Sequence, residues 1–353
     1  MTRQQVTDCD FRGLALVDAD VLGRRRTGDE TYVENLLRAL AAPAAGAGVR
    51  LAAVTRHVEL VPPGIEPIAL PARSQELRMA WSLPRLLGRL RPALAHFVHS
   101  LPLASPCPAV VTIQDLSFER EPALMGVKDR LVFRKAVRRA ARKAARVLAI
   151  SERTKRDVVE LYGVEPERVV VTPLGVDSVY RPGSERDRYV LFVGAIQARK
   201  DPLAAAAAAA ELGLRLVVAG PEKDRALARE LARRGADLRG YVGKEELADL
   251  YRRAACVVLP TRYEGFGLTV LEAMASGTPV VAAPDRAVRE VAGEVVVYAE
   301  RHRLADGIRR ALADARRLSA AGVERARAFS WEETARRTLA VYLDVLRAAE
   351  KVR

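Results

Sequence analysis

The sequence predicts an α/β protein of two domains, each built on a parallel sheet covered by helices. The chain has 353 residues, which is roughly two to three times the usual domain length. Strand-like and helix-like patterns alternate from end to end, as in parallel sheets with crossover helices. A stretch rich in turn-forming residues, 173–187, divides this alternation into two series. We therefore expect one domain over residues 1–180, a second over 181–330 and a helix over 331–353.

In the first half, short apolar runs predict strands and the segments between them predict helices. The strands are expected at residues 14–20, 49–56, 94–100, 109–115, 146–151 and 168–173. The clearest helices are expected at residues 31–42, 75–90 with a break near Pro84, 128–145 and 151–162. A strand followed by a helix is the repeating unit of a parallel sheet.

The second half repeats this order. Strands are expected at residues 189–196, 214–220, 255–260, 279–283 and 294–299, with a short one near 238–242. The alanine run 204–210 is of low complexity, but alanine is the best helix former, so we expect a helix rather than disorder. Ser330 and Glu333 form a capping box at the start of the last helix. Two Rossmann-like domains in tandem follow from this order.

The composition limits the class of protein. Hydrophobic residues make up 50% and charged residues 29% of the chain, the balance of a globular protein. No apolar run reaches the roughly 18 residues of a membrane-spanning helix, and the first residues lack a secretory pattern, so we expect a cytoplasmic protein. Cys9, Cys107 and Cys256 have neither disulfide nor zinc spacing.

The segment 257–284 carries the clearest sign of a binding site. It reads as strand, loop, helix, turn and strand, with Gly265 and Gly267 before a helix that starts near Leu268 and ends at Gly277. The free N–H groups of such a helix start favour a phosphate or a hydroxyl-rich anion. Ligands of doubly wound sheets bind outside the carboxyl ends of the strands, so we expect the site in a cleft between the domains.

Two carboxylates belong to this segment. Glu264 in the loop could accept hydrogen bonds from two sugar hydroxyls, and Glu272 in the helix could accept those of a ribose, a spacing that suits a nucleotide sugar. The alternative is that Glu264 only complements the helix dipole, that Glu272 is solvated and that the glycines only make a turn.

The run EGFGLTVLEAMASGTPVV resembles the signature of retaining glycosyltransferases of family 4, whose hallmark is two glutamates with seven residues between them. Supporting matches occur at residues 26–40, 111–122, 148–177, 189–202, 240–261 and 329–342. The resemblance implies the GT-B architecture, in which two Rossmann-like domains face each other across a cleft. It also implies that the helix over 331–353 crosses back to the first domain, with Trp331 packed at the crossing.

The resemblance implies specific roles for the residues of this segment. Glu264 would contact the donor sugar and Glu272 the nucleotide ribose. Backbone groups would be offered to the sugar and the diphosphate by Gly265, Phe266, Gly267 and Leu268. We count Glu264, Lys200 and Asp115 as the catalytic candidates.

The diphosphate would be held from both domains. Lys200 matches the family lysine that neutralises its charge, and a fixed cation is most effective where charge develops. Arg199 either shares that role or is a solvated residue at the start of a helix. Gly28 matches a glycine-rich turn in the loop after the first strand, facing the diphosphate. Ala195 stands where many relatives have an arginine, so one cation is missing or is supplied from elsewhere.

The first domain departs from the family at Gln114, where relatives commonly have histidine before the aspartate that is Asp115 here. Glutamine cannot titrate, so proton transfer at this position is excluded, whereas hydrogen bonding to a sugar is not. In the front-face mechanism that is usually proposed for these retaining enzymes, the leaving phosphate itself takes the proton of the acceptor. Asp115 would orient the acceptor, or only cap a turn.

The implied activity is the retaining transfer of a hexose, mannose or glucose, from a GDP- or UDP-linked donor to a saccharide or lipid-linked acceptor in glycan or cell-envelope biosynthesis. On general similarity alone, we favour mannose as the transferred sugar. No cofactor or metal is expected, since no DxD-like metal motif follows a strand in the way that metal-dependent glycosyltransferases require. The alternative is a non-catalytic protein of the same fold or a basic module that binds a polyanion. No nucleic acid is expected, because no stacking aromatic stripe accompanies the basic runs.

The formal net charge of +14 would attract the protein to an anionic surface such as a membrane. Residues 128–147 hold nine Lys and Arg against one Asp, and Trp81 lies among further arginines and leucines. Those arginines are Arg73, Arg78, Arg85, Arg89 and Arg91. One interpretation is peripheral contact with the inner face of an anionic membrane, where a lipid-linked acceptor would lie. The other is that the apolar faces pack on the sheet and the charges are solvated.

Overall fold

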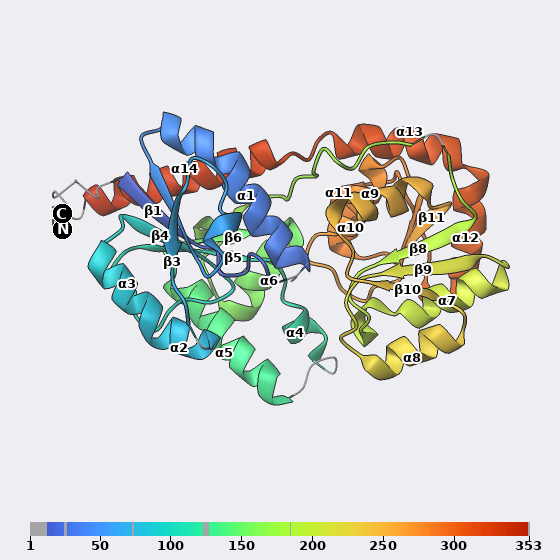
Figure 1. Cartoon of the computed structure of the whole chain (residues 1–353), viewed down its shortest axis with the longest axis horizontal. Coiled ribbons are helices and arrows are strands. Elements are labelled where there is room, and N and C mark those ends of the chain that lie inside the picture. The colour runs from blue at the N-terminus through green and yellow to red at the C-terminus, as the bar shows by residue number, and fades with distance from the viewer. Residues whose placement is uncertain (1–12, 25–26, 73, 123–126, 184, 352–353) are drawn as a thin grey trace.

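The computed structural model describes residues 13–24, 27–72, 74–122, 127–183 and 185–351. It has two lobes, each with a parallel sheet between helices (Figure 1). The first sheet has the order β3-β2-β1-β4-β5-β6-β7 and the second β10-β9-β8-β11-β12-β13. Cys9 and Arg73 lie outside the described residues.

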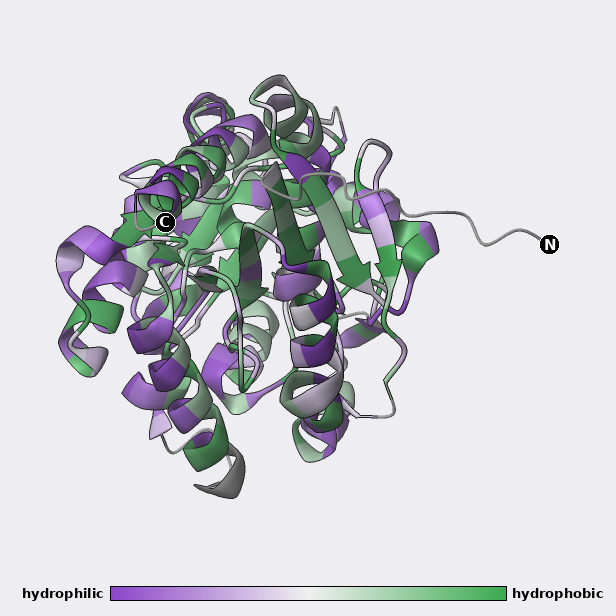
Figure 2. Cartoon of the chain, turned by 90° about the vertical axis from the view of Figure 1, so that its left-hand side faces the viewer, coloured by the Kyte–Doolittle hydropathy of each residue, from purple (hydrophilic) through white to green (hydrophobic). Residues whose placement is uncertain are grey.

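The strands of the first sheet are β1 (Leu14–Asp18), β2 (Arg50–Thr55), β3 (Glu66–Ala69), β4 (Leu94–Val98), β5 (Ala109–Ile113), β6 (Arg146–Ala149) and β7 (Val169–Val171). Those of the second are β8 (Tyr189–Val193), β9 (Arg215–Ala219), β10 (Asp237–Gly240), β11 (Cys256–Leu259), β12 (Val280–Ala282) and β13 (Val297–Tyr298). Every predicted strand is confirmed, and β3 is an additional one. Strands β5 and β8 are buried along their whole length, because helices cover both faces of each parallel sheet (Figure 2).

The helices of the first domain are α1 (Thr27–Gly46), α2 (Gln75–Leu77), α3 (Leu83–Leu90), α4 (Ser117–Arg120), α5 (Val127–Lys143) and α6 (Glu152–Tyr162). The second half contributes α7 (Pro202–Glu211), α8 (Arg225–Arg233), α9 (Lys244–Arg253), α10 (Leu268–Ala275), α11 (Arg286–Ala292), α12 (Leu304–Ala313), α13 (Ala315–Ala326) and α14 (Trp331–Glu350). The alanine run is helical within α7, as predicted.

Two local expectations need correction. The break expected near Pro84 is a π-helical stretch, Arg78–Ser82, which precedes the proline. Arg78 is turned inward there and donates two hydrogen bonds to Asp18, at 2.6 and 2.9 Å. Gly28 lies in the first turn of α1 and not in a loop, because two acidic residues that complement the helix dipole extend the helix to Thr27.

The strand orders create a crevice in each domain. The chain leaves β1 and β8 toward one edge of its sheet, and β4 and β11 open the series toward the other edge. Loops that follow neighbouring strands in opposite directions leave a gap at the carboxyl ends of the strands, where ligands of this architecture bind.

Helix α14 returns from the second domain and lies along the first (Figure 1). Its Ser330 cap accepts a hydrogen bond from the Glu333 N–H, which confirms one half of the predicted capping box, whereas the Glu333 carboxylate accepts from Arg336 and Arg337. Trp331 is buried with its ring 6.4 Å from that of Tyr32. Farther along, the Tyr342 hydroxyl lies 2.6 Å from Nδ1 of buried His96, which ties α14 to β4.

The two segments that cross between the domains touch each other. The first runs from β7 to β8 and the second is the start of α14. A Cβ atom on Gly175 would lie 2.1 Å from the backbone nitrogen of Trp331. The Val176 N–H donates to the Phe329 carbonyl at 3.3 Å. Only glycine permits this approach of two backbones.

Substitution of Gly175 by alanine is therefore expected to lower the free energy of unfolding by about 1–3 kcal/mol, as for other forced insertions into packed sites. Chemical denaturation measures this effect. The matched control is Gly88→Ala in α3, where nothing lies within 4 Å of an added Cβ. A helical Gly→Ala change there should raise stability by about 0.5–1 kcal/mol. Equal stabilities of the two variants would contradict the close contact.

Candidate active site

Lys200 and Glu264 lie together at the crevice of the second sheet. Lys200 follows β8 and Glu264 follows β11, the two central strands. The Lys200 ammonium forms an ion pair with Oε1 of Glu264, and the two side chains are only 13% and 11% exposed. Burial lowers the pKa of Lys200, and the neighbouring carboxylate of Glu264 counteracts part of that effect. Lys200 and Glu264 thus form an ion pair that is largely shielded from solvent, at the carboxyl ends of the strands.

The loop that carries Glu264 is fixed from several directions. The Glu264 N–H donates to Oδ2 of Asp285 at 3.2 Å, and the same oxygen accepts from Arg153 of the first domain at 2.7 Å. The Tyr263 hydroxyl donates to Oδ2 of Asp157 at 2.8 Å. Arg199 donates to the Tyr263 carbonyl. Arg199 therefore helps to hold the loop, a contact that was not predicted, and its part in binding a diphosphate stays a prediction.

Gly265 forms the contact between this loop and the first domain. Its carbonyl accepts hydrogen bonds from the hydroxyls of Ser151, at 2.6 Å, and Thr154, at 3.2 Å. A Cβ at this position would lie 2.1 Å from the carbonyl oxygen of Gln114. The residue must be glycine for the two domains to meet here.

The turn into α10 presents backbone donors. Gly267 has φ of 102°, which favours glycine, and Leu268 is the first residue of the helix. Within the described residues, no backbone hydrogen bond from the N–H groups of Gly265, Phe266 or Gly267 is formed. The Phe266 ring is buried and packs edge-on against that of Phe329, at 5.9 Å, so only the backbone of Phe266 can serve a ligand.

Glu272 lies one turn into α10 and is buried, which excludes the alternative of a solvated helix residue. The Tyr251 hydroxyl donates to its Oε2 at 2.8 Å, and Tyr180 of the interdomain segment also hydrogen-bonds it. Burial raises the pKa of Glu272 to about 7, even though these two hydrogen bonds lower it. Its carboxyl therefore keeps a proton up to near neutral pH and can donate one hydrogen bond as well as accept others.

The first domain supplies Gly28, Gln114 and Asp115. The side-chain oxygen of Gln114 lies 3.7 Å from where a Cβ of Gly28 would be. Its Nε2 is buried and has no hydrogen-bond partner among the described residues. Oδ1 of Asp115 accepts from the N–H and the hydroxyl of Ser117, at 3.0 and 2.9 Å, so this carboxylate caps a turn.

Several residues of the site were not predicted. His99 follows β4 with φ of 61°, and its Nε2 lies 3.3 Å from a carboxylate oxygen of Asp29. Burial lowers the pKa of His99, but Asp29 and Asp115 outweigh this and raise it. Asp285 caps α11 through two backbone N–H groups, and an aspartate directly before a helix could have revealed it.

Among the residues that the structure describes, no group of three or more His, Cys, Asp or Glu side chains is placed to hold a metal ion. No helix in that part of the chain is both long and apolar enough to span a membrane.

Two family models match the chain. The one described as "Glycosyl transferases group 1" matches residues 181–329. The one described as "Glycosyltransferase Family 4" matches residues 26–179. Together the matches cover the second sheet and all strands of the first sheet except β1.

Curated relatives match part of the chain. The D-inositol 3-phosphate glycosyltransferase of Acidothermus cellulolyticus is 37% identical over 231 residues, which are 54% of this chain and 51% of the relative. The protein of the same name from Frankia alni is 36% identical over 245 residues, 58% of this chain and 60% of the relative. The chain thus spans about half to three fifths of the length of these relatives.

Solved structures resemble the whole chain. A sucrose-phosphate synthase from Thermosynechococcus elongatus superposes with a TM-score of 0.75 at 21% identity, covering 95% of this chain and 99% of that one. Anabaena HepE in complex with UDP and glucose gives 0.72 at 16% identity, with 94% and 99% covered. At these identities the likeness shows the fold, which is GT-B as the sequence predicts.

The buried carboxyl of Glu272 should make stability depend on pH. The native state keeps its proton up to about pH 7, whereas the unfolded chain loses it near 4.5. The wild type therefore loses stability as pH rises through about 7. Glu272→Gln avoids burying the charge and should be more stable than the wild type at pH 8, by up to about 3 kcal/mol, and differ little at pH 5. Denaturant unfolding at both pH values measures this.

The matched control is Glu333→Gln. The hydrogen bonds from Arg336 and Arg337 lower the pKa of Glu333 to about 2, so its charge state is the same at pH 5 and pH 8. Its effect on stability should not change between those values. If the effect of Glu272→Gln on stability were also the same at pH 5 and pH 8, burial would not raise the pKa of Glu272 in the native state.

Proposed function

Because the chain belongs to the group 1 glycosyltransferases of family 4, we propose that it transfers a hexose from a nucleotide sugar to an acceptor hydroxyl with retention of configuration. The observation that carries the proposal is the placement of Lys200, Glu264 and the free N–H groups before α10 at one crevice. A cation, an acceptor carboxylate and backbone donors at that position suit a sugar diphosphate.

The donor would replace the ion pair of Lys200 and Glu264. Its diphosphate competes for the ammonium of Lys200, and Glu264, once released, accepts hydrogen bonds from the sugar hydroxyls. Glu272 accepts those of the ribose, in the pocket that it shares with Tyr251 and Tyr180. Each partner of the pair thus exchanges one charge contact for a contact with the donor.

The transfer step needs no titrating group from the first domain. The bond between the anomeric carbon and the phosphate oxygen breaks, and the acceptor oxygen bonds to the same face of that carbon. The acceptor proton passes to the leaving phosphate. Lys200 stabilises the charge that develops on the phosphate. The unpartnered amide nitrogen of Gln114 donates a hydrogen bond to a sugar hydroxyl, and Asp115 shapes the turn beside the acceptor.

The donor and acceptor classes follow from the relatives and remain proposals. HepE is described with UDP and glucose, and we propose a UDP- or GDP-linked donor that carries glucose or mannose, used without a divalent metal. The acceptor is a saccharide or a lipid-linked hydroxyl of glycan or cell-envelope biosynthesis. Since curated relatives are named for D-inositol 3-phosphate, a phosphorylated polyol is the first soluble acceptor to test.

We also propose peripheral contact with an anionic membrane, favoured by exposed apolar side chains next to arginines. Leu77, Trp81 and Leu103 are 54%, 60% and 67% exposed. The Leu103 N–H donates to the Met79 carbonyl, so the segment of Leu103 lies next to the helical segment that carries Leu77 and Trp81. Arg85 lies 4.8 Å above the Trp81 ring. We define Leu77, Trp81 and Leu103 as the apolar patch.

The donor is identified by thermal unfolding in the presence of GDP, UDP, ADP, dTDP and their sugar conjugates, with and without EDTA. A ligand at 100 times its Kd adds about 2.7 kcal/mol to the free energy of unfolding. Stabilisation by one base, unchanged by EDTA, is the expected result. Stabilisation by polyanions alone would favour the alternative of a basic binding module.

Two single variants separate the roles of the glutamates. Glu264→Ala should reduce transfer by at least a hundredfold, because the sugar loses its acceptor carboxylate, while affinity for the free nucleoside diphosphate changes little. Glu272→Ala should weaken nucleoside diphosphate binding about tenfold or more, since two hydroxyls lose their partner. Calorimetric titration and a transfer assay measure both. Equal losses of binding in the two variants would refute the separate roles.

Membrane contact is tested by co-sedimentation with vesicles that contain anionic lipid, at low and high salt. The wild type should bind at low salt and dissociate at high salt. The variant Leu77→Ser/Trp81→Ser should bind at least fivefold more weakly, because it lacks the apolar side chains that the membrane would bury. The control Leu312→Ser removes an exposed leucine of the second domain and should bind like the wild type. Equal binding of all three would contradict a role for the apolar patch.

A further inference from the structure

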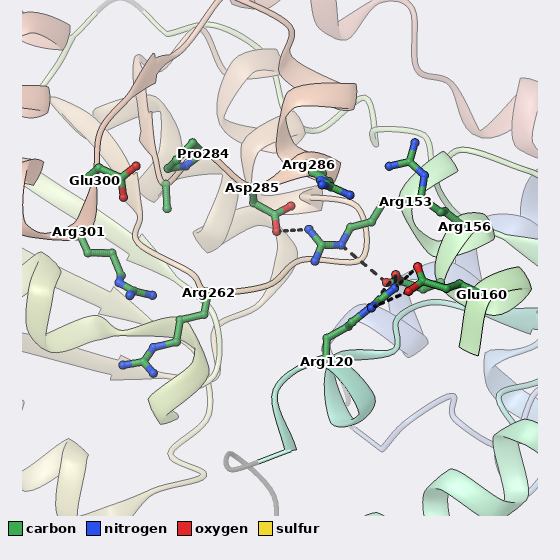
Figure 3. A pocket seen from close by; sticks show the side chains of 12 residues that line it. Arg120, Arg153, Arg156, Glu160, Arg262, Pro284, Asp285, Arg286, Glu300 and Arg301 are labelled. Atoms are coloured by element: carbon green, nitrogen blue, oxygen red, sulfur yellow. Dashed lines mark hydrogen bonds and ion pairs between the residues drawn. The ribbon is translucent and has the colours of Figure 1, made fainter. Parts of the chain in front are cut away.

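A second pocket lies between the domains, beside the loop of Glu264. Its volume is about 560 Å³. Six arginines from both domains line it (Figure 3). They are Arg120, Arg153, Arg156, Arg262, Arg286 and Arg301. We call this set the arginine pocket. Neither Lys200, Glu264 nor Glu272 lines it, so it is separate from the donor crevice.

Three of the arginines have carboxylate partners. Arg120 contacts Asp157 at 2.7 Å and Glu160 at 2.6 Å. Arg153 contacts Asp285 at 2.7 Å. Arg301 lies 3.6 Å from a carboxylate oxygen of Asp201. Glu300 also lines the pocket. These carboxylates neutralise only part of the positive charge of the six arginines.

The guanidinium groups of the other three arginines have no hydrogen bond or ion pair within the described residues. They are Arg156 of α6, Arg262 before the Glu264 loop and Arg286 at the start of α11. Arg156 and Arg286 come from different domains, yet both act on Glu160: the pKa of that carboxyl is lowered by Arg120 first and by these two as well. Since α6 packs against α11, Arg156 and Arg286 lie at one junction of the domains, and Arg262 lines the pocket from the segment before the Glu264 loop.

We propose that the arginine pocket binds a small, multiply charged anion of the phosphate monoester or pyrophosphate class, which bridges the two domains. Planar guanidinium groups bind phosphate oxygens in pairs, and an anion of two or more charges can engage arginines from both sides at once. A singly charged anion would leave part of the positive charge of the arginine pocket without a partner.

The pocket is linked to the donor site by two residues. Arg153 lies over the ring of Tyr263, at 4.0 Å, and binds the carboxylate of Asp285, which in turn accepts the Glu264 N–H. An anion that draws on Arg153 therefore changes a contact of the Glu264 loop. The site is thus placed to influence transfer without touching the donor.

The test is calorimetric titration of the full chain with inorganic pyrophosphate while a saturating nucleoside diphosphate occupies the donor crevice. The variant Arg156→Gln/Arg286→Gln removes one unpaired arginine from each domain and should bind pyrophosphate at least tenfold more weakly. The control Arg229→Gln/Arg316→Gln removes two exposed positive charges of the second domain that do not line the pocket, and should bind like the wild type. This control separates a built site from the general attraction of a basic protein.

Hydrogen exchange provides a second readout. Pyrophosphate should slow exchange both in α6 and in α11, because the anion bridges the domains. Four results would overturn the proposal: no binding to the wild type, equal weakening in both double variants, loss of binding in Lys200→Ala, or protection of only one of the two helices. The third would place pyrophosphate in the donor crevice. None of these results bears on whether transfer occurs, which the donor screen decides separately.

Discussion

The site depends on one backbone contact between the domains, where Gly265 meets the carboxyl edge of the first sheet. The Gly265 carbonyl would be a buried acceptor without water, and Ser151 and Thr154 satisfy it. Because the loop is fixed there, Glu264 is set beside Lys200 within its own domain and beside Gln114 of the other. Residues about 150 positions apart in sequence are thus positioned by this backbone contact, together with the hydrogen bond from the Tyr263 hydroxyl to Asp157.

Most of the fold could be predicted because parallel strands buried on both faces are continuous apolar runs. β8 and β11 are of this kind, and each is buried along its length. β3 could not be predicted, since it is an edge strand with exposed residues and a proline, Pro67, and therefore has the composition of a loop. The π-helical stretch at Arg78 was also hidden, because the partner of this buried arginine, Asp18, lies on β1, 60 positions away in sequence.

The glutamates of the site could be predicted from their spacing, but their partners could not. Tyr251 and Tyr180, which bind Glu272, come from another helix and from the interdomain segment, and nothing in their local sequence points to a carboxylate. The role of Arg199 depends on where the Tyr263 carbonyl lies in space. Local sequence specifies which groups could act, and tertiary structure specifies what each of them contacts.

The paired crossing at Gly175 and Trp331 has a mechanical consequence. Two chain segments that pass between the domains side by side act as a hinge pin, since they allow one domain to swing about their common line but oppose twisting and sliding. Any relative movement of the domains has to bend both segments together, which leaves fewer directions of movement than a single linker would allow.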